Sequence, residues 1–346
     1  MLEAIWREVP EIYNFAHATY NCAPHLQFGD FTILSNEGPQ QGDPPSPLEF
    51  CLTIQPMLVS LTSELKIEFL DDITMAVQKD IVVNDIISIK DKTDMYGLVL
   101  NAAKCEVVYG DPLAPHDDDT LKDFQRVELE NLTLLGAPVL SGRVIDKNIK
   151  QKTEKMKKAI SRLPLLQAHD ALTLLRNSIS VPKLLYTLRT YNCSENPLLV
   201  TFDIFQRKCL TDVINIDLNE DQWTQATLTI RDGCLGIRSV AMLASSAFFA
   251  SATSTLQIQN GILPARFHEV SDNAVDMATN SWRKLSGTDI PKIELRIKQK
   301  EWDRAVTNKN STELLDRASC SVAKARLRAA TAPHTGDWLL APPISE

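Results

Sequence analysis

The stretch Ile67-Glu68-Phe69-Leu70-Asp71-Asp72-Ile73-Thr74-Met75-Ala76-Val77 organises this chain. Two adjacent carboxylates separate two short apolar runs, and this pattern predicts a strand, a tight turn and a second strand. Because side chains alternate along a strand, Asp71 and Asp72 are expected to point in different directions from the tip of one hairpin. One of them can then aim at a shared point while the other supports it.

Two interpretations of this acidic tip stay open. Carboxylate oxygens are hard ligands that suit Mg²⁺. Polymerases use two such ions, about 4 Å apart, to activate an attacking oxygen and to stabilise the leaving pyrophosphate. Aspartate is also a common residue of ordinary polar turns. The pair alone favours a polar turn, so the segments around it have to decide.

Four segments, the acidic tip among them, carry the remaining signals. In chain order they are Gln41-Gly42 to Ser46-Pro47, Phe69-Leu70-Asp71-Asp72, Gly97 to Glu106, and Leu134-Leu135-Gly136-Ala137-Pro138-Val139. Gly42 suits a backbone that approaches a ligand closely, or a simple turn before a helix. Ser46 is a candidate N-cap, and Pro47 is tolerated in the first turn of the following helix.

Taken in this order, the four segments resemble motifs B, C, D and E in the palm of a reverse transcriptase of the non-LTR, LINE-like retrotransposon group. The resemblance continues through Trp223 to Ala226, Gly233 to Ser239 and Ala332 to Leu340. It implies an α+β fold. A partial palm with an antiparallel sheet and packed helices would occupy residues 1–142, a mainly helical thumb-like domain 143–260, and a helical C-terminal region 261–346.

The resemblance also implies roles for individual residues. Asp71 and Asp72 would hold Mg²⁺ for nucleotidyl transfer, and Lys104 would act as a general acid for the departing pyrophosphate. The implied substrate-binding residues are Gln41, Gly42, Ser46 and Pro47. The implied partners are an RNA or DNA template–primer and a deoxynucleoside triphosphate. A solvated lysine in a polar loop is the other interpretation of Lys104.

The sequence departs from the family pattern in two places. The family has a metal-binding aspartate in motif A, but Asp30 is the only aspartate before motif B, and it belongs to a Phe-Gly-Asp turn signal. The fingers are also missing, so we expect a chain truncated at its start. Glu49 stands where the family has an apolar residue, and a buried unpaired carboxylate is costly or takes up a proton. We expect the chain to be inactive alone.

Composition sets the broad class. The 346 residues, 44% of them hydrophobic, can bury a large core, and 36 basic against 44 acidic side chains give a net charge of −8. That balance is acidic for a nucleic-acid enzyme. Seven scattered cysteines without a Cys-x-x-Cys pair indicate reduced thiols. We expect an intracellular protein, cytoplasmic or nuclear, without a signal peptide or a membrane-spanning helix.

A lysine-rich segment follows the last motif. Apolar residues recur at helical spacing from Ile145 to Leu163 and predict one helix, over about 146–163, with a single apolar face. The candidate nucleic-acid-binding residues on this helix are Lys150, Lys155, Lys157 and Lys158. They can track the phosphates of a template–primer duplex. An ordinary solvated helix face is the other interpretation, and the sequence does not choose between the two.

Two functions of different classes therefore remain. The first is a fragment of an RNA-directed DNA polymerase domain, built for two-metal nucleotidyl transfer. The second is a non-catalytic remnant that binds nucleic acid or a protein partner. The retained Phe-Leu-Asp-Asp favours descent from a polymerase. Glu49, the missing motif A aspartate and the acidic balance favour a chain that is now non-catalytic.

Overall fold

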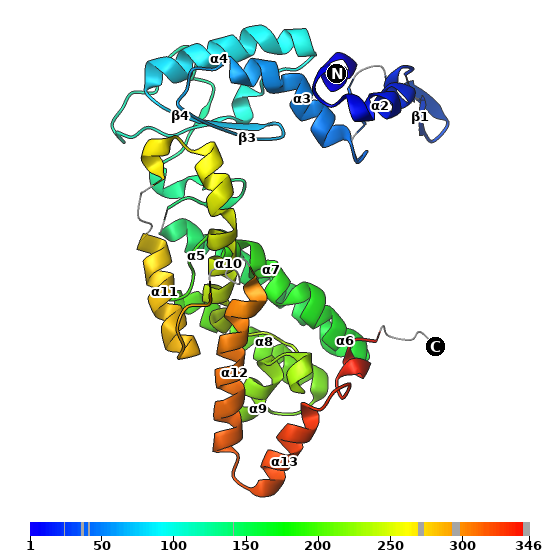
Figure 1. Ribbon diagram of the computed structural model, residues 1–346, viewed down its shortest axis with the longest axis vertical. Helices are drawn as coiled ribbons and strands as arrows, with labels where there is room; N and C mark the ends of the chain where they lie inside the picture. The colour runs from blue at the N-terminus through cyan, green and yellow to red at the C-terminus, as the bar shows by residue number, and fades with distance from the viewer. Residues whose placement is uncertain are drawn as a thin grey trace. The chain divides into compact units, whose positions relative to one another are not determined.

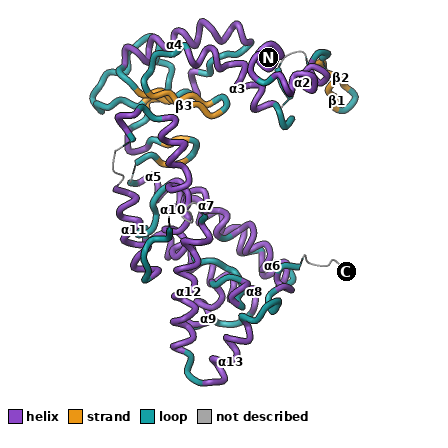
Figure 2. The backbone as a smooth tube through the Cα atoms, viewed as in Figure 1, coloured by secondary structure: helices purple, strands orange, loops and turns teal. Residues whose placement is uncertain are grey.

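The structure is a computed structural model that describes residues 1–23, 25–35, 38–40, 42–140, 142–268, 273–292 and 298–341 (Figure 1). Helices dominate this part of the chain. The strands form short two-stranded sheets, antiparallel except for one parallel pair (Figure 2). The expected α+β class is confirmed at this level. Within the described ranges, none of the helices is both long enough and apolar enough to cross a membrane.

Contacts within the chain define two compact units. Unit 1 comprises Met1–Val127 and Ile262–His268, and unit 2 comprises Glu128–Gly261 and Glu269–Glu346. Each unit has its own buried apolar clusters. The expected domain boundaries after residues 142 and 260 stay a prediction.

Unit 1 begins with two short helices and a hairpin. These elements are α1 (Leu2–Glu8), α2 (Tyr13–Tyr20), β1 (His25–Phe28) and β2 (Phe31–Leu34). Helix α1 ends before Pro10, because a residue that precedes proline is kept away from helical backbone angles, and Val9 accordingly has a φ of −143°. Gly29 has a φ of 61°, which glycine adopts without strain, and it lies in the turn between Phe28 and Phe31.

Two longer helices and a second hairpin form the centre of unit 1. They are α3 (Ser46–Val59), β3 (Leu65–Phe69), β4 (Asp72–Ala76) and α4 (Lys79–Thr93). The hairpin expected around the paired aspartates is present, with β3 and β4 antiparallel. Ile73 and Met75 of β4 pack against Ile54, Met57 and Leu58 of α3. Ile89 of α4 belongs to the same cluster.

A loop region completes unit 1. Its strands β5 (Glu106–Val107) and β6 (Gln125–Arg126) pair in parallel, and a short 3-10 helix, η3 (Ala102–Lys104), precedes them. The Arg126 guanidinium donates to the carbonyl oxygens of Pro112 and Ala114, and it lies 5.2 Å from the centre of the Tyr109 ring. These contacts close the polar loop that joins the two strands.

Unit 2 is mainly helical. Its short strands are β7 (Thr133–Leu134) and β8 (Ala137–Pro138). Its helices are α5 (Arg143–Ile160), α6 (Ala168–Leu174), α7 (Val181–Thr190), α8 (Pro197–Ile214), α9 (Glu220–Thr227), α10 (Val240–Ile262), α11 (Asn273–Ser286), α12 (Gln299–Arg317) and α13 (Ser321–Ala330). Helix α10 ends at the first residue of the segment that belongs to unit 1.

Two clusters account for much of the core of unit 2. Helices α5, α7, α8 and α10 meet around side chains that are almost completely buried, such as Ile149, Leu184 and Phe202. In the second cluster, the rings of Phe249 and Trp302 stack with centroids 4.5 Å apart. Trp282 meets Trp302 edge-on at 5.1 Å, and its Nε1 donates to the Trp302 carbonyl oxygen at 3.2 Å. This hydrogen bond satisfies the indole N–H in the core.

Segments about 100 residues apart in sequence meet in unit 2. A Cβ on Gly233 would lie 2.2 Å from the Ala330 carbonyl oxygen, and a Cβ on Gly336 would lie 2.5 Å from the side chain of Ile230. Only glycine permits approaches this close. Arg176 Nη2 also donates to the Leu339 carbonyl oxygen at 2.6 Å. The C-terminal segment up to Leu339 is therefore built into unit 2.

Candidate functional site

The turn between β3 and β4 contains two residues. Phe69 pairs with Asp72, which leaves Leu70 and Asp71 as the two turn residues. Leu70 has a φ of 57°, a left-handed conformation that costs a non-glycine residue roughly 1–2 kcal/mol. Strained backbone of this kind clusters at functional sites. The acidic tip is therefore the first candidate site in the molecule.

The register of the hairpin decides where the carboxylates lie. Ile73 and Met75 pack onto the core of unit 1, so this face of the hairpin is turned inward. Because side chains alternate, Asp72 lies on the opposite face together with Phe69, and both are exposed. Asp71 is exposed in the turn itself. Both carboxylates are thus accessible to a ligand from solvent.

Two polar side chains anchor the start of this hairpin. Lys66 Nζ donates to the carbonyl oxygens of Leu61 at 2.7 Å and Leu58 at 3.3 Å. The positive charge of this lysine stabilises the carbonyl groups at the C-terminal end of α3, which have no partner within the helix. Asp85 of α4 accepts hydrogen bonds from the backbone and hydroxyl groups of Thr62 and Ser63, at 2.6–3.1 Å. Burial by itself raises the pKa of Asp85, but these hydrogen bonds outweigh it and hold that pKa below its usual value.

The loop before α3 contains the implied substrate-binding residues. Gln41 lies outside the described residues. Gly42 is exposed with a φ of 95°, a conformation that favours glycine. Ser46 is not the N-cap that its position suggested: it is the first residue of α3, and its Oγ donates to the Gln40 carbonyl oxygen at 2.7 Å. Pro47 occupies the first turn of the helix and is exposed, as expected.

Glu49 follows in the same helix and is completely buried. Neither of its carboxylate oxygens has a hydrogen-bond partner among the described residues. Burial raises the pKa of Glu49, and the negative charge of nearby Asp43 raises it further. Asp43 itself accepts a hydrogen bond from the Tyr20 hydroxyl. The buried, unpaired carboxyl that the sequence made a concern is thus present, and its environment favours the protonated form.

Lys104 ends the short helix η3 and is exposed. Its neighbours Ala102 and Cys105 pack against the buried cluster that contains Ile86 of α4, and Met75 of β4 packs against the same cluster. Met75 also packs on α3, so a single side chain links the hairpin to both flanking segments. Among the described residues, no hydrogen bond or ion pair joins Lys104 or the loop before α3 to Asp71 or Asp72, so the structure does not assemble these three segments into one site by direct contact.

A magnesium ion can be tested against these residues. Among the residues that the structure describes, no three histidine, cysteine, aspartate or glutamate side chains gather where they could hold a metal. Mg²⁺ is often bound by only one or two carboxylates, with water and substrate phosphates completing its shell. Asp71 and Asp72 fit that mode. Asp30 lies in the separate turn of β1–β2.

The basic helix of unit 2 is a second candidate site. Lys150, Lys155 and Lys158 are exposed on α5. Lys157 is engaged within the chain: its Nζ lies 2.6 Å from Glu154 Oε1 and 4.0 Å from the centre of the Phe205 ring. The geometry therefore weakens Lys157 as a nucleic-acid-binding candidate and leaves the other three available.

Sequence reasoning missed one basic residue of this surface. Helix α5 begins at Arg143, three residues earlier than expected, and this adds an exposed guanidinium one turn before exposed Lys147. A shallow hollow of about 420 Å³ lies along these first turns. Its lining residues are Arg143, Asp146, Lys147, Lys150 and Gln151. The spacing of 143, 147 and 150 is the signal that would have found Arg143.

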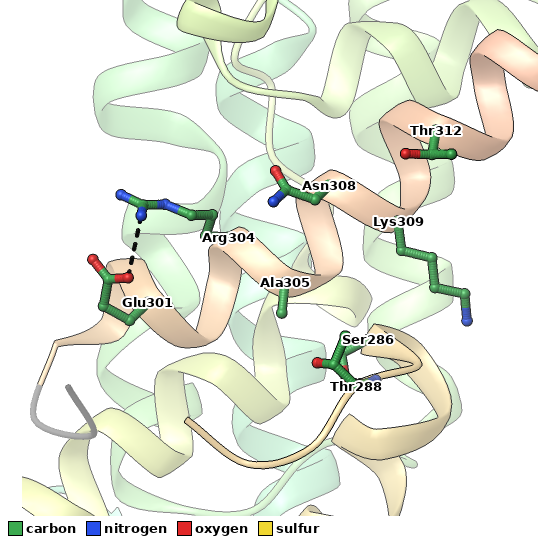
Figure 3. Close-up of a pocket in the computed structure, with 8 residues that line it drawn as sticks. All are labelled: Ser286, Thr288, Glu301, Arg304, Ala305, Asn308, Lys309 and Thr312. Carbon is green, nitrogen blue, oxygen red and sulfur yellow. Dashed lines mark hydrogen bonds and ion pairs between the residues drawn. The ribbon is translucent and has the colours of Figure 1, made fainter. Parts of the chain in front are cut away.

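Another hollow, of about 350 Å³, lies between the end of α11 and α12 (Figure 3). Its two cationic side chains do not converge. Figure 3 shows Arg304 directed toward Glu301, with an ion-pair distance of 3.4 Å, and away from Lys309. Lys309 Nζ donates to the Lys284 carbonyl oxygen at 2.9 Å. Since both cations already have partners within the chain, this hollow is the weaker candidate.

No family model matches the chain, and no curated protein matches it. The resemblance to reverse transcriptases therefore depends on the sequence motifs alone.

Proposed function

We propose that the chain is a palm-and-thumb fragment of a LINE-like reverse transcriptase, related to RNA-directed DNA polymerases and inactive as a polymerase by itself. The observation that carries the proposal is the acidic tip of β3–β4. Asp71 and Asp72 are exposed at a strained turn, on a hairpin whose inner face is fixed to α3. The left-handed backbone of Leu70 adds no distinction, because two-residue hairpin turns require it and Leu135 has a φ of 50° in the turn of β7–β8.

Each residue of this site has a chemical task in the proposed function. Asp71 and Asp72 would hold Mg²⁺, which supplies positive charge to phosphate oxygens when it is bound. Lys104 would give a proton or its charge to the departing pyrophosphate. Gly42 would let the backbone come close to a nucleotide, because it has no side chain to obstruct it.

The proposed inactivity follows from the number of carboxylates. Two ions in a polymerase share a bridging carboxylate from a second strand, and a hairpin with two adjacent aspartates does not supply it. Asp30 is the only aspartate before residue 41, and it lies in the turn of β1–β2. Phosphoryl transfer depends on charge neutralisation at this point, so losing the ligand should lower the rate by orders of magnitude.

Two measurements test the proposal. In primer extension on an RNA template with Mg²⁺, we expect no product; extension that disappears in Asp71→Ala/Asp72→Ala would show that another carboxylate completes the centre. Mn²⁺ binding, followed by paramagnetic broadening, should be lost in Asp71→Asn/Asp72→Asn and retained in Asp91→Asn/Asp94→Asn. The control carries the same charge change at exposed positions of unit 1. Equal Mn²⁺ binding by all three proteins would reject the hairpin as the metal site.

A second function, non-catalytic binding of nucleic acid, is favoured by the exposed basic face of α5. Arg143, Lys147, Lys150, Lys155 and Lys158 are exposed there, with Glu154 as the one exposed acid of this helix. This local surface is positive although the chain has a net charge of −8. Phosphate contacts need only such a local surface.

Anisotropy of a labelled template–primer duplex tests this second function. Lys147→Glu/Lys150→Glu should weaken binding roughly tenfold or more and flatten its salt dependence, because each phosphate contact releases a counterion. Lys208→Glu/Lys300→Glu makes the same charge change at exposed positions of other unit 2 helices and should have little effect. If both variants weaken binding equally, general charge rather than α5 is responsible.

A further inference from the structure

The two units differ in charge. Unit 1 contains nine lysine or arginine residues against 21 aspartate or glutamate residues and has a net charge of −12. Unit 2 contains 27 against 23 and has a net charge of +4. The acidic excess of the chain therefore lies in unit 1. A surface of this sign repels phosphate groups and attracts cationic partners.

Most basic side chains of unit 1 already have partners within the chain. Eight of the nine form a hydrogen bond or an ion pair with another residue: Arg7, Lys66, Lys79, Lys90, Lys92, Lys122, Arg126 and Arg266. Several of these bonds go to backbone carbonyl oxygens, which leaves surface acids without a cation beside them. Unit 1 therefore presents unneutralised carboxylates to a partner.

A row of these carboxylates lies on one face of α4 and of the residue that follows it. Five exposed residues recur there at helical spacing, and we call them the α4 crest: Asp80, Asn84, Ile87, Asp91 and Asp94. On the opposite side of the helix, Asp85, Ile86 and Ile89 are buried. The crest therefore faces away from the core of unit 1, and Figure 1 shows α4 along the outer edge of that unit.

The lysines of α4 lie on the flanks of the crest. Lys79 Nζ lies 3.5 Å from Asp118 Oδ2, and Lys90 Nζ donates to a carbonyl oxygen of the same polar loop at 3.4 Å. On the other flank, Lys92 Nζ donates to Ser60 Oγ at 2.6 Å. The crest acids themselves form no ion pair with a described residue. The outer face of α4 is thus negative although the helix contains three lysines.

We propose that the α4 crest docks a basic helix of a protein partner, with lysine or arginine residues on both sides of an apolar residue. Ile87, at the centre of the crest, is 43% exposed. Asp80 and Asp94 each lie seven residues from it, or about 10 Å along the helix axis. A partner helix has the same residue spacing, so cations seven residues from its apolar residue can meet both acids. The proposal does not depend on either function proposed above.

Other occupants match the crest less well. Nucleic acid and the crest of a second copy carry the same sign of charge and are repelled. Asp80 and Asp94 are about 20 Å apart along the axis, too far to share one metal ion. Helix α5 of a second copy has suitable charge, but none of its exposed residues is apolar, so it cannot cover Ile87. Charge and the apolar centre together therefore select a basic helix that also carries an apolar residue.

Fluorescence anisotropy on the full chain tests the proposal with a defined probe. The probe is a labelled helical peptide of alanine and lysine, with one central leucine and lysines about seven residues to either side. It should bind the unmodified chain, and added salt should weaken that binding, because charges contribute to it. Asp80→Lys/Asp91→Lys/Asp94→Lys should weaken binding roughly tenfold or more, because like charges then face each other.

A matched variant separates the crest from the charge of unit 1 as a whole. Glu3→Lys/Glu11→Lys/Glu106→Lys makes the same charge change at exposed positions outside α4 and should weaken binding about twofold at most. Ile87→Ser tests the apolar centre without a change of charge. It should weaken binding of the leucine probe severalfold and leave binding of a probe with a central alanine unchanged. Circular dichroism checks that each variant folds, which we expect because the replaced side chains are exposed.

Three anisotropy results would overturn the proposal. They are no binding by the unmodified chain, equal weakening by the two triple variants, and no effect of Ile87→Ser on the leucine probe. Sedimentation velocity on the full chain addresses the remaining occupant. Self-association that the charge reversal of the crest abolishes would assign the crest to the basic α5 of another copy, and this also overturns the proposal. A chain that stays monomeric while it binds the leucine probe supports a separate basic partner.

Discussion

Unit 1 and unit 2 use their apolar side chains differently. Of the twelve largest side chains that are almost fully buried in the described residues, three belong to unit 1 (Ile5, Leu58 and Leu121) and nine to unit 2. Unit 1 instead exposes the apolar face of its β1–β2 hairpin and carries the acidic tip. Unit 2 thus holds most of the large buried side chains, while unit 1 leaves more of its apolar side chains exposed.

The two units also treat a buried acid differently. Glu49 in unit 1 has no hydrogen-bond donor among the described residues. Asp203 in unit 2 accepts from Ser239 Oγ at 2.6 Å and from the backbone N–H groups of Val240 and Ala241 at 2.9 and 3.3 Å. Asp203 therefore fastens α8 to the start of α10, whereas Glu49 weakens the helix that carries it.

The largest expected effect is in the aromatic core of unit 2. Trp302→Ala removes the ring that stacks on Phe249 and that Trp282 meets edge-on, and it should cost about 3–5 kcal/mol of unfolding free energy. Trp338→Ala, at a 59% exposed position, is the matched control and should cost far less. Thermal unfolding followed by hydrogen exchange should show unit 2 opening first. Simultaneous loss of amide protection in both units would contradict the inference that this core stabilises unit 2 separately from unit 1.

Asp203 should make the stability of unit 2 depend on pH. Burial raises its pKa from 3.8 to about 6, despite three hydrogen bonds that favour the charged form. Between these values the folded state binds more protons than the unfolded state, so stability falls as the pH rises from about 4 to 6, by up to about 3 kcal/mol. Asp203→Asn keeps an acceptor oxygen and should remove this slope in urea unfolding curves. If the unfolding free energy of Asp203→Asn depends on pH as steeply as that of the unmodified chain, other groups cause the dependence.

Gly233 tests the close approach of the C-terminal segment. Gly233→Ala puts a Cβ against the Ala330 carbonyl oxygen at a φ of 76°, and it should destabilise unit 2 by about 2–3 kcal/mol. Gly261→Ala has open space and lies in α10, so it should be neutral or slightly stabilising. Similar midpoints for the two variants in chemical denaturation would contradict the packing of this segment.

The smallest expected effect comes from replacing the buried carboxyl of Glu49 in unit 1. Glu49→Gln or Glu49→Leu removes a buried ionisable group and should stabilise unit 1 by about 1 kcal/mol at neutral pH. Because the pKa of Glu49 is raised from 4.5, the stability of the unmodified chain should fall as the pH rises above that value. The variants should lack that part of the slope. Destabilisation by Glu49→Leu would mean that the carboxyl has a partner in solution.

Local patterns were enough to predict the elements that carry the candidate site. The apolar runs around Asp71 and Asp72 predicted a hairpin, and periodic apolar residues predicted α5 to within three residues of its start. Strand β1 was missed, although the alternation of polar and apolar residues from His25 to Phe28, directly before the Phe-Gly-Asp turn, is a short strand signal. The role of Ser46 was also wrong: Pro45 holds the N-cap position, and the serine hydroxyl is committed to Gln40.

Contacts between distant segments were beyond the sequence patterns. The contact of Lys157 with Phe205 depends on how α5 packs on α8, which periodicity does not give, whereas its pair with Glu154 three residues earlier on the same helix follows from the spacing. Complete burial of Glu49 depends in the same way on the helices around it. The tasks assigned to Asp71, Asp72 and Lys104 stay predictions, because an exposed carboxylate or ammonium has no geometry that fixes its partner.

The contacts of the C-terminal segment matter for anyone who shortens or tags this protein. Residues 332–339 would ordinarily be trimmed as a polar tail. Here Gly336 lies against Ile230, Leu339 is almost completely buried, and its carbonyl oxygen receives Arg176. A version that stops before Ala332 would leave a guanidinium without its acceptor and strip cover from apolar surface. Such a version is expected to express poorly, whereas a fusion placed after Ala341 leaves these contacts intact.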